Sequence, residues 1–240
     1  MTFPKKPTLG TDTLRIHDNF NQRIVVPPED YVWTPSPSTG VERIMLDRIG
    51  GEIARATSIV RYLPHSQFPS HIHHGGEEFF VLQGIFSDEY GQYPKGTYVR
   101  NPIGTKHTPK IGNQGATIFV KLHQFHANDN MRKSIDTNST DWQDGMMKDP
   151  RVMLLHEYGK ERVSLVKLAA NTHLKSMHRN GGEEILVLEG TLYDEYGTYP
   201  KGTWLRLPHR SRYSFYTETT GALLFSKTGH LNKKINRMGE

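Results

Sequence analysis

The sequence has no cysteine among its 240 residues. Disulfide bonds, thiolate metal sites and cysteine nucleophiles are therefore excluded, and any bound metal must be held by histidine, carboxylate or water. No apolar run approaches the ~18 residues that a membrane-spanning helix requires. The first residues of the chain also lack the apolar segment of a secretory signal. These absences predict a cytoplasmic protein without a membrane partner.

Charge is only weakly biased, because 30 Lys and Arg stand against 25 Asp and Glu and give a formal net charge of +5. Nucleic-acid-binding proteins usually gather such cations in a patch or stripe. Here the cations are scattered, and only residues 227–240 concentrate them, which is typical of a solvated chain terminus. The composition therefore argues against a nucleic-acid partner.

Glycine and proline are plentiful, with 22 and 14 residues, and they separate short runs of strand-forming residues. Helical periodicity is weak throughout the chain. Residues 77–94, EEFFVLQGIFSDEYGQYP, indicate one strand, a bend at Gly84, a second strand and a turn at Tyr90–Gly91. Several short strands at this spacing predict an all-β protein built as an antiparallel sandwich or barrel.

The chain carries an internal repeat. Residues 75–102 and 181–208 are identical at 18 of 28 positions with an offset of 106 residues, and the match continues without a gap on both sides. A period of this length is the size of a compact domain and is too long for a solenoid repeat. We therefore predict two similar domains, residues 1–128 and residues 129–240, connected by the polar stretch 126–145.

A cluster of histidines marks the first domain. In the stretch SHIHHGGEEFF, His71 and His73 are two residues apart, so both side chains project to one face of a strand. Glu77 shares that parity, and a return strand could place His107 opposite the pair. Taken alone, the two histidines could equally be strand residues without a ligand role. The fitting positions of the other two residues favour a site for a divalent first-row metal.

These residues form two spaced patterns, His71-x-His73-x3-Glu77-x6-Gly84 and Gly96-x5-Pro102-x-Gly104-x2-His107. The patterns resemble the two motifs of cupins, in which three histidines and one glutamate bind a metal inside a jelly-roll barrel. The resemblance implies that His71, His73, Glu77 and His107 are the metal ligands. Two positions depart from the family pattern, because His65 replaces a glycine and Ile111 replaces an asparagine. Neither position carries a ligand.

The stretches WTPSPSTGVERIMLDRIGGE and GTYVRNPIGTKHTP are similar to the ChrR-type cupin family, which is named for the C-terminal cupin of a zinc-binding anti-sigma factor. The likeness is close from Trp33 to about Phe125 and looser in the second unit. It implies a tandem cupin, or bicupin, with a metal-binding first barrel and a degenerate second barrel. More distantly, the chain resembles cupin dioxygenases that cleave β-diketones or hydroxyacetophenones at a three-histidine iron centre.

In the second unit the 106-residue offset places Met177, Arg179, Glu183 and Tyr213 at the four ligand positions, so only the glutamate is retained. An isolated buried carboxylate is costly. We therefore predict that Arg179 pairs with Glu183 in the second barrel, with Tyr213 nearby, and that this barrel binds no metal. In a weaker alternative, Arg179 binds the carboxylate of a ligand in this pocket.

Three functions remain open at this point. The first is a dioxygenase-like metalloenzyme that holds one Fe, Zn, Mn or Ni ion and acts on a small molecule such as a diketone, hydroxyketone or carboxylate, with Glu77 as a ligand or a base. The second is a ligand- or redox-sensing regulatory cupin, although the anti-sigma factors also use a cysteine-containing zinc domain. The third is a storage or structural bicupin. A homodimer is a further expectation.

Overall fold

The computed structural model describes residues 14–142, 150–174, 177–178 and 180–231. The described chain folds into two large antiparallel sheets, each accompanied by a small two-stranded sheet, which confirms the prediction of tandem all-β barrels. Its single helical element is the three-residue 3-10 turn η1 (Pro28–Asp30). Among these residues, no helix is long and apolar enough to span a membrane.

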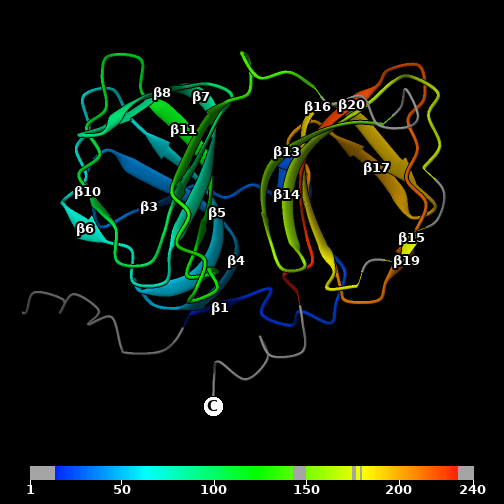
Figure 1. The fold of residues 1–240 in the computed structure, drawn as a ribbon, viewed down its shortest axis with the longest axis horizontal. Coiled ribbons are helices and arrows are strands. Elements are labelled where there is room, and N and C mark those ends of the chain that lie inside the picture. The colour runs from blue at the N-terminus through cyan, green and yellow to red at the C-terminus, as the bar shows by residue number, and fades with distance from the viewer. Residues whose placement is uncertain (1–13, 143–149, 175–176, 179, 232–240) are drawn as a thin grey trace, which may run out of the picture.

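The first large sheet has nine strands in the order β1-β4-β5-β11-β7-β9-β12, with β3 paired to β4 and β8 paired to β7. Strands β6 and β10 form its small companion sheet, which lies on the outer side of the molecule (Figure 1). The bounds of these strands are β1 Arg15–Ile16, β3 Thr34–Pro35, β4 Val41–Gly50, β5 Ala54–Tyr62, β6 His71–Ile72, β7 Glu77–Asp88, β8 Gly91–Pro94, β9 Thr97–Asn101, β10 Lys106–His107, β11 Ala116–Leu122 and β12 Lys133–Asp136.

The second large sheet has seven strands in the order β13-β14-β20-β16-β18-β2, with β17 paired to β16. Strands β15 and β19 form its small companion on the opposite outer side (Figure 1). The bounds of these strands are β2 Ile24–Val26, β13 Arg151–Tyr158, β14 Glu161–Leu168, β15 Met177–His178, β16 Glu183–Asp194, β17 Gly197–Pro200, β18 Trp204–Leu207, β19 Arg212–Tyr213 and β20 Ala222–Thr228.

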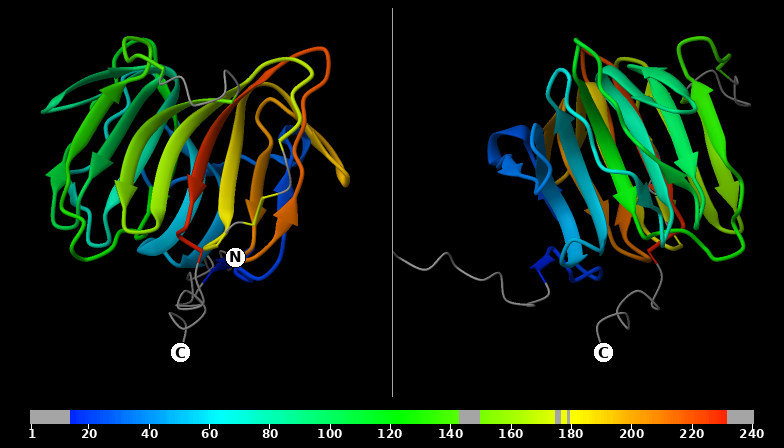
Figure 2. Two further views of the ribbon diagram at one scale, coloured as in Figure 1. Left: turned by 45° about the vertical axis from the view of Figure 1, so that its right-hand side comes forward. Right: turned by 90° about the vertical axis from the view of Figure 1, so that its left-hand side faces the viewer.

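The two halves exchange an edge strand. Strand β2 precedes the first unit in the chain but pairs with β18 of the second sheet, where Val26 lies opposite Trp204 (Figure 2). Strand β12 follows the first unit and pairs with β9, where Lys133 lies opposite Arg100. Each exchanged strand completes the edge of a sheet that belongs to the other half of the repeat, so the two barrels are joined by backbone hydrogen bonds as well as by side chains.

Apolar side chains pack between the two large sheets. Phe80, Tyr98 and Phe119 of the first sheet pack with Trp204 and Phe225 of the second in one buried cluster. Separate apolar clusters fill the inside of each barrel. The central strands are therefore buried on both faces, which explains why their sequences form continuous apolar runs instead of strict alternation. Burial of each large side chain contributes about 1.5–3 kcal/mol.

The bend that the sequence predicts at Gly84 lies inside one continuous strand, close to a β-bulge. Strand β7 runs through this position, and its register against β11 shifts at Leu82, two residues earlier. Gly84 has a φ of +70°, and a Cβ atom at this residue would collide with the carbonyl oxygen of Gly115. Only glycine meets both conditions, so the residue curves the strand without ending it.

Candidate metal centre

The structure brings the four predicted ligands together on the inner side of the first barrel. His71 of β6 lies opposite His107 of β10, and His73 follows two residues later. Glu77 begins β7 directly after a turn at Gly76, where a side chain would collide with the Phe125 ring. One donor atom from each of the four residues lies within 4.8 Å of all the others. Three are buried, and His71 is half-buried at the entrance.

Hydrogen bonds donated by the Nδ1 atoms orient the first two imidazoles. His71 Nδ1 lies 2.9 Å from the carbonyl oxygen of Pro69. His73 Nδ1 lies 2.9 Å from the Thr105 hydroxyl, which in turn donates to the carbonyl oxygen of Pro102. These oxygen atoms accept hydrogen bonds from Nδ1–H and so fix the proton on Nδ1. Each ring therefore turns the lone pair of Nε2 toward the centre.

Asp88 performs the same task for the third imidazole. Its Oδ2 lies 3.0 Å from His107 Nδ1, while its Oδ1 accepts hydrogen bonds from the backbone N–H of Tyr90 and Gly91 and from the Tyr93 hydroxyl. A carboxylate that accepts from the outer nitrogen of a histidine fixes the ring and raises its basicity toward a metal. Sequence reasoning missed this residue, because the motif DEYG occurs in both units and indicates only a hairpin.

A divalent cation fits this set of donors. Nε2 of His107 lies 3.2 Å from Nε2 of His71, and both atoms present lone pairs once Nδ1 carries the proton. Nε2 of His73 is buried and has no hydrogen-bond partner, which is costly for a polar atom unless a cation takes the lone pair. The Glu77 carboxylate lies 3.3 Å from this nitrogen and receives a hydrogen bond from Asn101. Three imidazoles and one carboxylate suit a first-row metal such as Fe, Mn, Ni or Zn.

The environment shifts the pKa values of two of these histidines in opposite directions. Burial lowers the pKa of His73 to about 4, although the Glu77 charge opposes the shift. Burial also disfavours the charged form of His107, but the hydrogen bond that His107 donates to Asp88 and the charge of Glu77 outweigh it and raise the pKa of His107. His73 is therefore neutral near pH 7, the form in which imidazole binds a metal.

The centre opens into a cavity of about 300 Å³. Its apolar wall consists of Val41, Val60, Tyr62, Phe68, Val120 and Leu122. Two arginines of β4, Arg43 and Arg48, contribute to the same cavity, as do Glu52 and the hydroxyl-bearing Ser58. The largely apolar wall limits water at the centre, and the few polar groups are available to orient a small ligand.

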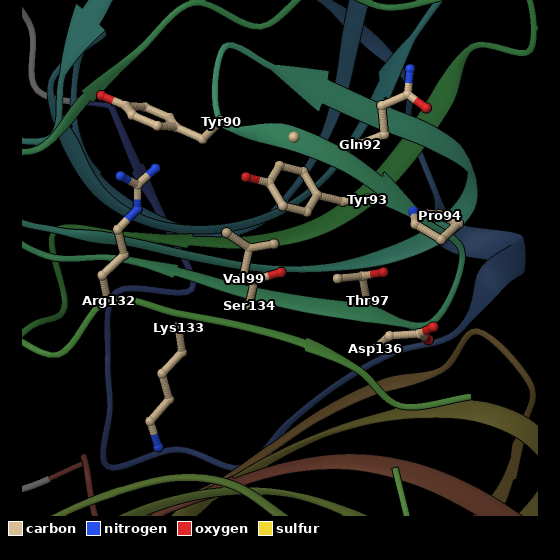
Figure 3. Close-up of a pocket in the computed structure, with 11 residues that line it drawn as sticks. Tyr90, Gln92, Tyr93, Pro94, Thr97, Val99, Arg132, Lys133, Ser134 and Asp136 are labelled. Carbon is tan, nitrogen blue, oxygen red and sulfur yellow. The ribbon is translucent and has the colours of Figure 1, made fainter. Parts of the chain in front are cut away.

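A second cavity of about 570 Å³ is lined by residues of β8, β9 and β12 and of the segments beside them. Figure 3 shows Tyr90 and Arg132 facing each other at one end, with Lys133 directed away. The Arg132 guanidinium lies 3.7 Å from the centroid of the Tyr90 ring. Tyr93 lines this cavity and donates to Asp88, so it connects the cavity to the hydrogen bond that orients His107.

The second barrel presents different groups at the corresponding place. Tyr213 of β19 lies opposite Met177 of β15, and its hydroxyl donates to the Glu183 carboxylate. The Ser226 hydroxyl donates to the other oxygen of Glu183 at 2.6 Å. Tyr213 is thus near Glu183, as the sequence predicts, whereas Arg179 lies outside the described residues and its pairing stays a prediction. Within the described ranges, the four-residue group of the first barrel is the one cluster of potential metal ligands.

Solved structures of low sequence identity share this fold. A proposed dioxygenase from Nostoc punctiforme matches with a TM-score of 0.69 at 18% identity, over 94% of this chain and 85% of that one. A proposed glyoxylate-induced protein from Pseudomonas aeruginosa gives a TM-score of 0.70 at 14% identity, over 93% and 92% of the two chains. The oxalate decarboxylase of Lactobacillus farciminis, in a formate complex, gives 0.63 at 9% identity, over 91% and 90%.

Family membership follows from the sequence itself. No curated protein matches the chain. The model of the ChrR cupin-like domain, however, matches it twice in succession, over residues 21–126 and 130–232. Each match spans one of the two barrels, and the first contains all four residues of the candidate metal centre. The protein is therefore a bicupin that belongs to the ChrR cupin-like domain family.

Proposed function

We propose that the protein is a metal-dependent cupin that binds one divalent ion in its first barrel and acts on a small oxygen-bearing molecule in a dioxygenase-like reaction. The convergence of three Nε2 atoms and the Glu77 carboxylate at one end of an enclosed cavity carries this proposal. A metal held there would act as a Lewis acid toward the oxygen atoms of the substrate. The second barrel serves as the structural partner of the first.

The chain's own residues have distinct tasks in this proposal. Asp88 keeps the His107 ring in the orientation that directs Nε2 inward. Glu77 is positioned by Asn101, and one of its carboxylate oxygens would accept the proton that a ketone substrate loses as it becomes an enolate. The apolar wall, with Tyr62 and Phe68, holds the substrate carbon skeleton and limits competing water.

Two of the structural relatives have described functions that agree with a small oxygenated substrate. One is described as a proposed dioxygenase, and another is an oxalate decarboxylase crystallised with formate. Their identities of 18% and 9% support the shared fold, and the assignment of chemistry to this chain is our proposal. A cytoplasmic location and a homodimer stay predictions.

The description of the matching family model favours one second candidate, a metal-binding regulatory cupin. In that function the same centre would hold its metal permanently, and the cavity would bind an effector without turning it over. The two candidates differ in what they predict for metal exchange and for oxygen consumption, so one set of measurements separates them.

The first experiment is metal analysis of protein purified without added metal. Acetylacetone and aryl ketones are then mixed with the protein without oxygen, and oxygen uptake is followed with an oxygen electrode after aerated buffer is added. The enzyme is expected to contain about one equivalent of iron or a similar metal and to consume oxygen with a ketone. Tightly held zinc and no oxygen consumption would support the regulatory candidate. Two metal ions per chain would contradict the assignment of the second barrel.

The ligand assignment is tested by His71→Ala, which is expected to lower metal affinity by at least roughly tenfold because one of four donors is lost. His74→Gln is the matched control, since this neighbouring histidine is exposed and belongs to no group of converging donors. The control is expected to keep the wild-type metal content. Unchanged metal content in His71→Ala would disprove the assignment.

A further inference from the structure

The cavity at the candidate metal centre is lined by two arginines. Arg43 and Arg48, both on β4, line the cavity together with three of the proposed metal ligands. Arg48 is only 3% exposed, so its charge is largely removed from water. Arginine is rarely buried without a partner, and its fork of five donors matches a carboxylate. The question is therefore what this side chain binds.

The two arginines differ in how their charge is balanced. Arg43 forms a bidentate pair with Glu52, with nitrogen–oxygen distances of 2.9 and 3.3 Å. Arg48 donates to the backbone carbonyl oxygens of Gly50 and Gly51, and no ion pair joins it to any carboxylate of the described chain. Burial and the nearby charge of Arg43 both lower the pKa of Arg48, and the charge of Glu52 only partly opposes them. A bound anion would offset both effects.

The charges that line the cavity balance only while no metal is bound. Arg43 and Arg48 contribute two positive charges, and Glu52 and Glu77 contribute two negative charges. A divalent ion at the centre adds two positive charges to a space with a mostly apolar wall, where uncompensated charge is expensive. The metal-loaded cavity therefore favours an anionic ligand over a neutral ligand of the same shape.

Comparison of the two barrels shows that these arginines occur together with the metal ligands. Arg48 lies opposite Ala56 in β5. The repeat equivalent of Ala56 is Arg162, which lies opposite Glu157. Glu157 is therefore the counterpart of Arg48 in the second barrel. The second barrel thus has an exposed carboxylate where the first has a buried guanidinium. By the same register, Arg43 lies opposite Val60 and corresponds to Val152 of the second barrel. If the arginines only stabilised the barrel, both copies would need them.

We propose that Arg48, assisted by Arg43, binds the carboxylate group of a small oxo acid whose remaining oxygen atoms face the metal. This inference rests on the proposed function and narrows its substrate class from ketones in general to anionic ketones. The cavity volume of about 300 Å³ lies at the low end of ligand sites and restricts the substrate to a small metabolite.

The test uses the full chain loaded with Co²⁺, whose visible absorption changes when a ligand reaches the metal. Pyruvate is the anionic probe, and pyruvamide is its neutral analogue, in which an amide NH2 group replaces one carboxylate oxygen. We expect the wild-type protein to bind pyruvate more tightly than pyruvamide. Arg48→Gln is expected to weaken pyruvate binding by roughly 10- to 100-fold, because a charged hydrogen bond is lost, and to leave pyruvamide binding unchanged.

Two further variants distinguish a loss of carboxylate recognition from a structural disturbance of the loop 51–53. Glu52→Gln removes one negative charge and releases Arg43, so pyruvate binding should tighten by about two- to five-fold, whereas a disturbed loop would weaken it. Arg61→Gln removes an arginine of β5 that pairs with Glu42 and does not line the cavity, and it should change neither affinity.

The possible failures are distinguishable. If the wild-type protein takes up one metal but Arg48→Gln leaves pyruvate affinity within twofold, or weakens both probes equally, the carboxylate site is disproved and the proposed metal function stands. If the wild-type protein takes up no metal, the proposed function fails and this inference fails with it.

Discussion

At the scale of the residue, two equivalent aspartates of the two barrels share a local motif but have different surroundings. Asp88 and Asp194 each cap a hairpin by accepting backbone N–H groups two and three residues later. The second oxygen of Asp88 faces His107, whereas the second oxygen of Asp194 faces Arg23 at 2.6 Å. The repeat thus supplies a natural control for the role of Asp88 in the metal centre.

Asp88→Asn is expected to lower metal affinity by about 10- to 100-fold, as observed for other residues that orient metal-bound histidines. If the amide oxygen stays with the hairpin N–H groups, the amide nitrogen faces His107 Nδ1, and it cannot accept the proton there. The measurement is a competition titration with a chromogenic chelator. Asp194→Asn removes the same charge from the same turn and should leave the affinity within twofold. Equal losses in both variants would contradict the role.

The ligands themselves could be predicted because their evidence is local. His71 and His73 follow strand parity, and Glu77 and His107 stand at cupin spacing. Asp88 could not be predicted, because its contact with His107 depends on how the β7–β8 hairpin lies against β10, which no local pattern encodes. The place of Arg48 in the cavity could not be predicted for a similar reason, because its burial depends on strands that are distant in the sequence.

At the scale of the element, the long strand β7 depends on Gly84, which lies beside its β-bulge. Gly84→Ala is expected to lower the free energy of unfolding by about 2–4 kcal/mol, because alanine at positive φ is strained and its Cβ would displace the backbone of Gly115. Urea denaturation followed by tryptophan fluorescence measures this change.

Gly91→Ala in the neighbouring strand is the matched control for that loss. Its nearest atoms would lie 3.6 Å from the new Cβ, an ordinary van der Waals contact, so a change within about 0.5 kcal/mol is expected. If the two variants were equally stable, the bulge would not require glycine.

The strand exchange lies beyond what the sequence predicts. Strand β2 has three residues, IVV, and its apolar character indicates a strand but not the sheet that it joins. Its partner β18 is about 180 residues away in the chain, and antiparallel pairing at that separation follows from the assembled barrels. The repeat itself was predictable, because it needs only self-comparison of the sequence.

At the scale of the whole molecule, the duplication places reciprocal ion pairs between the barrels. Lys121 of the first sheet pairs with Glu184 of the second, and Lys227 of the second sheet pairs with Glu78 of the first. The two pairs are related by the 106-residue offset, and all four side chains are buried. Buried pairs are costly to desolvate, but removal of one partner is costlier still. They therefore favour this one docking of the two barrels.

Acid pH provides the test of this arrangement. Burial alone would raise the pKa of Glu184, but the charge of Lys121 and the hydrogen bond from His230 lower it well below its ordinary value of 4.5. A carboxylate with a lowered pKa contributes stability that is present above its ordinary value and is lost as the pH falls toward the folded value. The unfolding free energy should therefore fall below about pH 4.5.

Two variants isolate the contribution of this pair. Glu184→Gln is expected to cost about 3–5 kcal/mol at pH 7, because Lys121 stays buried without its partner. The double variant Lys121→Met, Glu184→Gln should recover most of that loss, since no buried charge is then unpaired. Both variants should lose stability less steeply than the wild type when urea unfolding is repeated from pH 7 to pH 3. If the unfolding free energy of the double variant fell with pH as steeply as that of the wild type, the acid sensitivity would come from other carboxylates.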